Sequence, residues 1–207
     1  MVPWLAIVVT LAGSAAAGER PWERVTERDG MVIEQRAVEG SSAREVRATV
    51  HSSLSSAALM ATIWRHEEYV EFMPNLSRLD VLRDDGDSKL IYEQLDVPIV
   101  KNRDLTLRIT RTFHRETGTY EISSEAVPDE GPPPSDEFVR VRTSTSRWRL
   151  VPAADGTDVE YSLYTDGGGA VPGWMAKLIL KEVTAKILRS MLDRAQRNAG
   201  RDGPGAP

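Results

Sequence analysis

The sequence contains no cysteine and only three histidines among its 207 residues. The absence of cysteine excludes disulfide bonds, thiol catalysis and a lipid-modified N-terminal cysteine, so core packing alone must stabilise the fold. His51, His66 and His114 are far apart in the sequence and show no metal-ligand spacing. His51 and His114 fall on the polar side of strand patterns, where surface histidines are expected. The sequence therefore predicts no metal site.

Motifs for covalent and cofactor chemistry are also missing. The sequence contains no G-x-S-x-G nucleophile elbow. Gly167, Gly168 and Gly169 fall short of a dinucleotide fingerprint, because Pro172 stands where the last glycine should be and no βαβ pattern surrounds them. We therefore expect no cofactor and a function other than catalysis.

The charge pattern argues against nucleic acid as a partner. The formal net charge is −5, and the arginines alternate with acidic residues instead of clustering. The length allows one domain of about 190 residues after processing, with a core large enough to fold alone.

Both ends of the chain differ in composition from the middle. An apolar run, Trp4 to Gly13, precedes Ala15-Ala16-Ala17, a small-x-small site that predicts signal-peptide cleavage before Gly18. We therefore expect a signal peptide over 1–17, a domain over 18–198 and a disordered Gly/Pro tail over 199–207, in a periplasmic or secreted protein. Because the first residues contain no Lys or Arg, an uncleaved anchor remains the alternative.

Alternation of apolar and polar residues dominates from Val25 onwards and predicts half-buried strands. Asp29-Gly30 is a strong two-residue hairpin turn between the first two of them. Strands are predicted over 25–28, 31–37, 45–51, 76–83, 89–97, 104–114, 120–127, 139–150 and 157–165, with two short helices over 55–64 and 67–72. The fold class is therefore α+β, with about nine strands, of which the last six form an antiparallel meander.

A glycine-rich corner, Asp166 to Trp174, separates the last strand from the longest predicted helix, 172–197. The apolar face of this helix extends over more than half of its circumference, which is more than simple packing requires. The helix is either a deeply seated core helix or one that packs on a sheet and also covers an apolar cavity.

Four motifs in this order resemble the START (StAR-related lipid transfer) domains. They are an apolar segment that ends in Arg103-Asp104, the pair Val139-Arg140, the run Trp148 to Pro152, and the glycine corner that leads into the last helix. The resemblance covers roughly residues 22–197. It implies a helix-grip fold, in which a curved antiparallel sheet surrounds the C-terminal helix and an apolar tunnel between them holds one lipid. Asp96 stands where many members carry a first proline.

Two opposite charges interrupt apolar strand faces in the predicted meander. Glu93 shares a face with Ile91 and Leu95, and Arg111 shares one with Leu107 and Ile109. A lone buried charge costs several kcal/mol, so each needs a partner. We expect Glu93 and Arg111 to pair inside the cavity and to anchor a lipid hydroxyl or headgroup, by analogy with sterol-binding START domains. The alternative places both at strand ends, in contact with solvent.

The remaining candidate positions divide into cavity, gate and structural residues. Apolar ligand contacts are expected from Leu107, Ile109, Ile179 and Val183, and at the cavity mouth from Phe72, Met73, Trp174 and Met175. Pro98, Ile99 and Val100 form either a gate or a core plug. We favour a gate made by the 96–102 loop and the C-terminal helix, with Gly167, Gly168 and Gly169 as the hinge of that helix. Arg103 and Asp104 are expected to fix loop geometry.

We therefore expect a monomeric carrier that binds a sterol or phospholipid and contacts membrane surfaces transiently. We expect it to catalyse no covalent reaction. The first alternative is an enzyme of the helix-grip superfamily, such as a polyketide cyclase or a hydrolase, that uses Glu93, Arg111 or Tyr92 in the same cavity. A second alternative is a module that senses a small non-lipid ligand.

Overall fold

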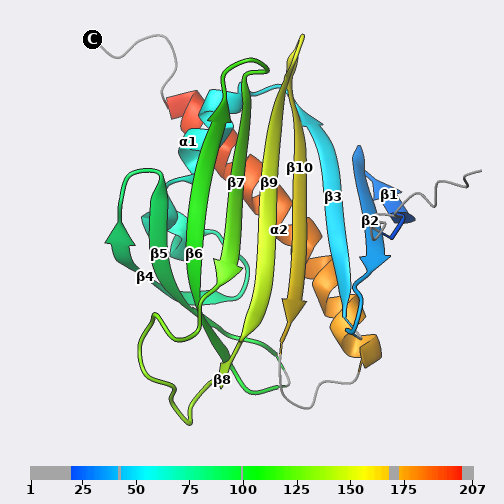
Figure 1. Cartoon of the computed structure of the whole chain (residues 1–207). Coiled ribbons are helices and arrows are strands. Elements are labelled where there is room, and N and C mark those ends of the chain that lie inside the picture. Colours follow the sequence, from blue (N-terminus) through cyan, green and yellow to red (C-terminus); the bar gives the residue numbers. More distant parts are fainter. Residues whose placement is uncertain (1–19, 42, 99, 168–172, 202–207) are drawn as a thin grey trace, which may run out of the picture.

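The computed structural model describes residues 20–41, 43–98, 100–167 and 173–201, with the side chains of 173–179 and 201 outside that description. Within these ranges the chain forms one antiparallel sheet, two short helices and one long helix (Figure 1). The strands are β1 (Glu23–Arg28), β2 (Met31–Ala37), β3 (Arg44–Ser52), β4 (Leu76–Asp84), β5 (Ser88–Leu95), β6 (Arg103–His114), β7 (Thr119–Ala126), β8 (Val139–Arg140), β9 (Thr143–Ala153) and β10 (Gly156–Asp166). The helices are α1 (Ser56–Ile63), the 3₁₀ helix η1 (His66–Glu71) and α2 (Gly173–Arg201).

The turn between β1 and β2 has the backbone that its sequence demands. Asp29 and Gly30 both have positive φ, 54° and 74°. This is the left-handed region that two-residue hairpins of the primed type require, and Asp and Gly tolerate it best. The predicted hairpin is confirmed.

The two short helices between β3 and β4 are also confirmed. The Ser55 hydroxyl accepts a hydrogen bond from the Ala58 N–H at 3.2 Å and so caps the start of α1. The second helix, η1, is a 3₁₀ helix and ends at Phe72, whose N–H donates to the Tyr69 carbonyl.

The sheet order is β1-β2-β3-β10-β9-β7-β6-β5-β4, so the six long strands from β4 to β10 form the predicted antiparallel meander. The meander then joins the N-terminal hairpin through β10, which pairs with β3. Figure 1 shows the resulting curved sheet with α2 lying diagonally across one of its faces.

One predicted strand is wrong. The alternating segment 139–150 is not continuous, because β8 pairs with the start of β6 in parallel and the chain then turns into β9. The Val139 N–H donates to the Asn102 carbonyl and the Val141 N–H to the Asp104 carbonyl. These bonds hold the segment at the edge of β6 and account for the tenth strand.

The long helix α2 packs on the sheet through one stripe of side chains. Its buried residues recur at helical spacing: Leu180, Thr184, Ala185, Leu188, Met191 and Ala195. The helix continues to Arg201, so the predicted tail boundary at residue 199 is wrong. No helix among the described residues is long and apolar enough to cross a membrane. The predicted signal peptide, 1–17, lies outside the described residues.

Candidate ligand-binding cavity

A cavity of about 410 Å³ lies between the concave face of the sheet and α2. Its walls come from β5, β6, β7, β9 and β10 on one side, from α2 on the other, and from η1 and the segment that follows it. The volume falls within the range of about 300–1,000 Å³ that is typical of small-molecule sites.

The walls are mainly apolar because every second side chain of a strand faces the cavity, and these side chains are mainly apolar. On β6 the apolar side chains that line the cavity are Leu105, Leu107 and Ile109. On α2 they are Leu180, Val183 and Ile187. Trp148 and Tyr161 stack with their ring centroids 4.2 Å apart and form part of the wall on β9 and β10. Three of the predicted contacts, Leu107, Ile109 and Val183, thus line the cavity.

Loop residues bound one end of the cavity, which we call the loop end. They include Ala43, Val97, Val100 and Gly167. Of the predicted gate, Val100 and Gly167 therefore line the cavity and Pro98 does not, while Ile99, Gly168 and Gly169 lie outside the described residues.

The predicted mouth residues divide in the same way. Met73 lines the cavity, whereas Phe72 does not. The Phe72 ring instead packs edge-on against Tyr69 and lies under the Arg194 guanidinium, 5.4 Å from its carbon. The side chains of Trp174, Met175 and Ile179 lie outside the described part of the chain.

The predicted pair between Glu93 and Arg111 is wrong. Glu93 lies opposite Leu105 in the β5–β6 ladder, and Arg111 is six residues further along β6, or about 20 Å away at the usual strand rise. The Arg111 guanidinium binds the Asp87 carboxylate at 2.8 Å and lies over the Trp64 ring. Arg111 is therefore outside the cavity lining, and the strand register decides against the pair.

Glu93 itself lines the cavity. Its carboxyl group makes no hydrogen bond or ion pair with any described residue. Burial raises the pKa of this carboxyl from 4.5 to about 7. The charge on Glu93 acts on the phenols of Tyr69 and Tyr161, whose pKa values are raised by burial first and by this charge in addition. The cavity therefore contains a carboxyl group that no described residue neutralises.

Four hydroxyl groups in the wall are paired with one another. The hydroxyls of Ser124 and Ser146 are 2.7 Å apart, and those of Ser144 and Thr165 are 2.6 Å apart. Both pairs bridge neighbouring strands on the cavity side. These hydroxyl pairs make the wall polar in places without adding charge to it.

The buried histidine of η1 was not predicted as a cavity residue. His66 is 2% exposed, lines the cavity and contacts the Trp64 carbonyl through Nδ1 at 3.2 Å. Burial, together with the nearby Lys89 ammonium, lowers the pKa of His66 to about 4. Because His66 lies on a short 3₁₀ helix, the sequence around it has no hydrophobic repeat from which its burial could have been predicted.

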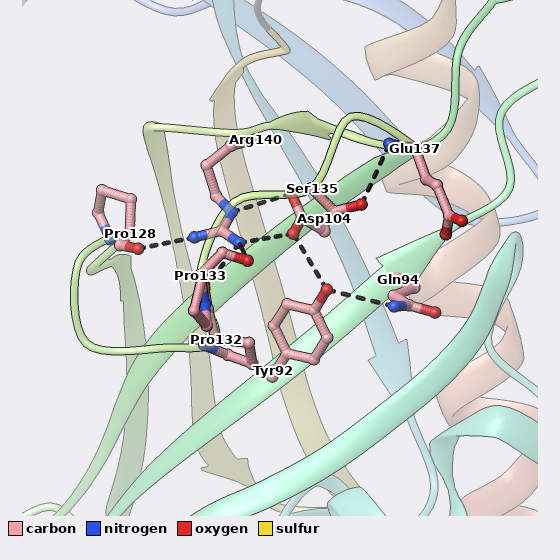
Figure 2. Close-up of polar contacts among 9 residues, drawn as sticks. All are labelled: Tyr92, Gln94, Asp104, Pro128, Pro132, Pro133, Ser135, Glu137 and Arg140. Carbon is pink, nitrogen blue, oxygen red and sulfur yellow. Dashed lines mark hydrogen bonds and ion pairs between the residues drawn. The ribbon is translucent and has the colours of Figure 1, made fainter.

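Arg103 and Asp104 lie on opposite faces of β6. Arg103 faces the cavity, whereas Asp104 faces the convex side, where it accepts two hydrogen bonds from Arg140, at 2.9 and 2.7 Å, and one from the Tyr92 hydroxyl, at 3.0 Å. Figure 2 shows that Arg140 also reaches the carbonyl oxygens of Pro128 and Pro132. This ion pair holds the proline-rich loop 127–138 against the outside of the sheet.

The START domain model matches residues 7–201 of this sequence. The chain belongs to the START domain family. A STAR-related lipid transfer protein from Xanthomonas axonopodis is 26% identical, with a TM-score of 0.78 over 84% of this chain and 98% of the solved one. Human STARD10 has the same fold, with 17% identity and a TM-score of 0.76 over 87% of this chain and 75% of that one. An uncharacterized protein of Pseudomonas aeruginosa is 24% identical over 93% of this START domain chain and 94% of its own length.

The described residues of this START domain contain no group of three or more His, Asp or Glu side chains that could hold a metal ion. The α+β helix-grip fold predicted from the sequence is confirmed by the sheet, the helix and these relatives.

Proposed function

We propose that this START domain binds one hydrophobic ligand in the cavity between α2 and the sheet and carries it between membranes. The observation that carries the proposal is the mainly apolar cavity of about 410 Å³, which ends at loop residues. Transfer of apolar surface from water into such a wall is favourable by roughly 25 cal/mol per Å². A lipid could therefore be held firmly without any covalent step.

Glu93 is the proposed polar anchor inside this cavity. Its carboxyl has no partner among the described side chains, and it can donate to or accept from a lipid hydroxyl or headgroup. A ligand that supplies this hydrogen bond removes the cost of an unpaired buried carboxyl. The anchor therefore selects lipids with a hydroxyl or a polar headgroup over pure hydrocarbons.

Release of a lipid requires an opening, and we propose that it forms at the loop end. The gate is the 96–102 loop together with the segment around Gly167, both of which contribute to the lining through Val97, Val100 and Gly167. Apolar residues in a loop that opens would contact the membrane surface during transfer. We further propose that the protein acts as an exported monomer, without a cofactor.

The test is lipid capture by a variant with a filled cavity. Ile187→Trp adds bulk on the cavity side of α2, and Lys186→Trp adds the same bulk at the neighbouring exposed position. Native mass spectrometry after incubation with mixed vesicles should show one bound lipid on the wild type and on Lys186→Trp. It should show none on Ile187→Trp, and transfer of a fluorescent lipid between vesicles should fall in parallel. Equal capture by all three proteins, or capture by none, would contradict the proposal.

A second candidate is catalysis in the same cavity, because a carboxyl with a pKa of about 7 suits a general acid or base. The aromatase/cyclase Zhui from Streptomyces has a similar fold, with 16% identity and a TM-score of 0.56. Incubation with a linear aromatic polyketide separates the two functions. A carrier returns the compound unchanged, and an enzyme returns a product of different mass or ring number.

A further inference from the structure

We propose that Arg103 forms an anion-binding site at the loop end of the cavity, and that the ligand is a single-chain amphiphile with an anionic headgroup. This inference rests on the proposed function, since it names the class of ligand that the cavity takes.

Arg103 begins β6 on the same face as Leu105 and Leu107 and lines the cavity with them. The residue is only 6% exposed. Its guanidinium donates to the Lys101 carbonyl oxygen and makes no other hydrogen bond or ion pair with a described residue. Since a guanidinium has five N–H donors, several remain available to a ligand. Arginine also keeps its charge when buried, so the cavity contains a cation that no described residue compensates.

The neighbouring residues do not neutralise this charge. Asp104, next in the chain, lies on the other face of β6 and is bound by Arg140. Glu93 is a diagonal neighbour of Arg103 on the adjacent strand, because Glu93 lies opposite Leu105 while Arg103 lies opposite Leu95, yet the two make no ion pair.

The other ionisable residues of the lining are already engaged. His66 contacts the Trp64 carbonyl, Tyr69 donates to the Ile63 carbonyl at 2.5 Å, Tyr161 interacts with the Ser146 hydroxyl, and Asp166 has a polar partner of its own. Arg103 is therefore the cation of the described lining that lacks a counter-ion. A carboxylate or phosphate is the group that a guanidinium fork binds best.

The position of Arg103 sets the orientation of the ligand. It stands at the first residue of β6, beside the loop-end residues Val97 and Val100, whereas Ile109, Ile122 and Ile187 supply apolar wall away from it. An amphiphile would therefore place its chain along the apolar wall and its anionic headgroup at the loop end. A volume of about 410 Å³ lies near the lower limit of ligand pockets and favours one acyl chain over two.

The experiment compares ligands that share one chain and differ in headgroup. Delipidated protein is loaded with a fluorescent fatty acid, which is displaced by dodecanoate, dodecyl phosphate, dodecanol or dodecyltrimethylammonium. A charge-assisted hydrogen bond predicts that at least one anionic probe binds about tenfold or more tighter than dodecanol. The two anionic probes distinguish a carboxylate from a phosphate headgroup. Acetate and inorganic phosphate, which lack the chain, should not displace the dye.

Variants assign the effect to one side chain. Arg103→Gln should bring the affinities for the anionic probes to within about threefold of that for dodecanol, and Arg103→Lys should keep part of the preference. Arg111→Gln is the matched control, because Arg111 is on the same strand but lies outside the cavity. This variant should prefer the anionic probes over dodecanol as strongly as the wild type does. Binding of dodecanol by Arg103→Gln shows that the variant is folded.

The possible failures are distinguishable. If no probe with a chain binds, the proposed function fails. If dodecanol binds as tightly as the anionic probes, or if Arg103→Gln keeps the anionic preference, the cavity is a lipid site but Arg103 is not its anion-binding residue. If acetate or inorganic phosphate displaces the dye and the probes with a chain do not, the ligand is a small anion, and the proposal of an amphiphilic ligand is wrong. A preference for dodecyltrimethylammonium would assign recognition of the headgroup to Glu93 and would overturn the inference as well.

Discussion

The cavity contains two ionisable groups whose effects on stability oppose each other, and replacing each in turn separates them. Burial raises the pKa of Glu93 from 4.5 to about 7 and lowers that of His66 from 6.5 to about 4. Each shift of one unit corresponds to about 1.4 kcal/mol, so each group changes the free energy of unfolding by roughly 3 kcal/mol across its pH window.

The signs of the two contributions are opposite. Glu93 is protonated in the folded state up to about pH 7 but ionised in the unfolded chain above pH 4.5, so its contribution to stability is full below pH 4.5 and is lost as the pH rises to 7. His66 is neutral in the folded state but protonated in the unfolded chain below pH 6.5, so stability is lost as the pH falls from 6.5 to 4. Between about pH 4.5 and 6.5 the two slopes cancel, and these groups leave the wild-type profile flat.

Urea unfolding of the ligand-free protein, at steps of half a pH unit from 4 to 8, measures the difference between each variant and the wild type. Glu93→Gln removes the carboxyl, so its stability relative to the wild type should rise by roughly 3 kcal/mol between pH 4.5 and 7. His66→Phe should gain a similar amount between pH 6.5 and 4. Glu116→Gln, at an exposed position in the β6–β7 turn, controls for the loss of one surface charge. A difference for Glu93→Gln that does not depend on pH would refute the claim that its carboxyl is desolvated in the cavity.

Three further changes test the frame around the cavity. Arg140→Met leaves the buried Asp104 carboxylate without its counter-ion, and should lower the free energy of unfolding by about 3–5 kcal/mol in urea; a loss below about 1 kcal/mol would contradict the role of this ion pair. Gly131→Ala places a Cβ where an ideal one would be 1.9 Å from the Thr106 hydroxyl oxygen, so about 1–3 kcal/mol should be lost by the same measurement. An unchanged midpoint would show that the loop moves freely. Leu188→Ala, at a position with no exposed surface, should lower stability by about 2–5 kcal/mol in thermal unfolding, and a loss under 1 kcal/mol would mean that α2 is not packed there.

The fold could be predicted from the sequence wherever the signal is local. Alternation, a primed turn at Asp29-Gly30 and a serine cap at Ser55 determined the strands and helices to within about three residues, apart from the split strand and the helix end. The failure at 139–150 has a tertiary cause. That segment alternates throughout, and it is interrupted where β8 pairs with β6 and Arg140 binds Asp104, 36 residues away in the sequence. No local pattern encodes such a partner.

The sequence predicted which side of the sheet the candidate site residues face, but not which residues of neighbouring strands lie opposite each other. Alternation assigned Glu93, Leu107 and Ile109 to the side of the sheet that lines the cavity. It could not say which residue of β6 lies opposite Glu93, because that depends on how the loop between β5 and β6 closes. In the observed register Leu105 lies opposite Glu93, and Arg111 lies towards the end of the strand, where it binds Asp87.

The same alternation separates two charged neighbours into different roles. Arg103 and Asp104 are adjacent in the sequence, yet the pleat directs one to the concave face and the other to the convex face of β6. On the convex face Arg140 satisfies the aspartate, so that ion pair is complete without a ligand. Among the described residues, the arginine on the concave face has a backbone carbonyl as its one hydrogen-bond acceptor, so most of its donors are left for a ligand. A motif that reads as one charged pair in the sequence therefore acts as a structural anchor on one face and, in our proposal, as a ligand contact on the other.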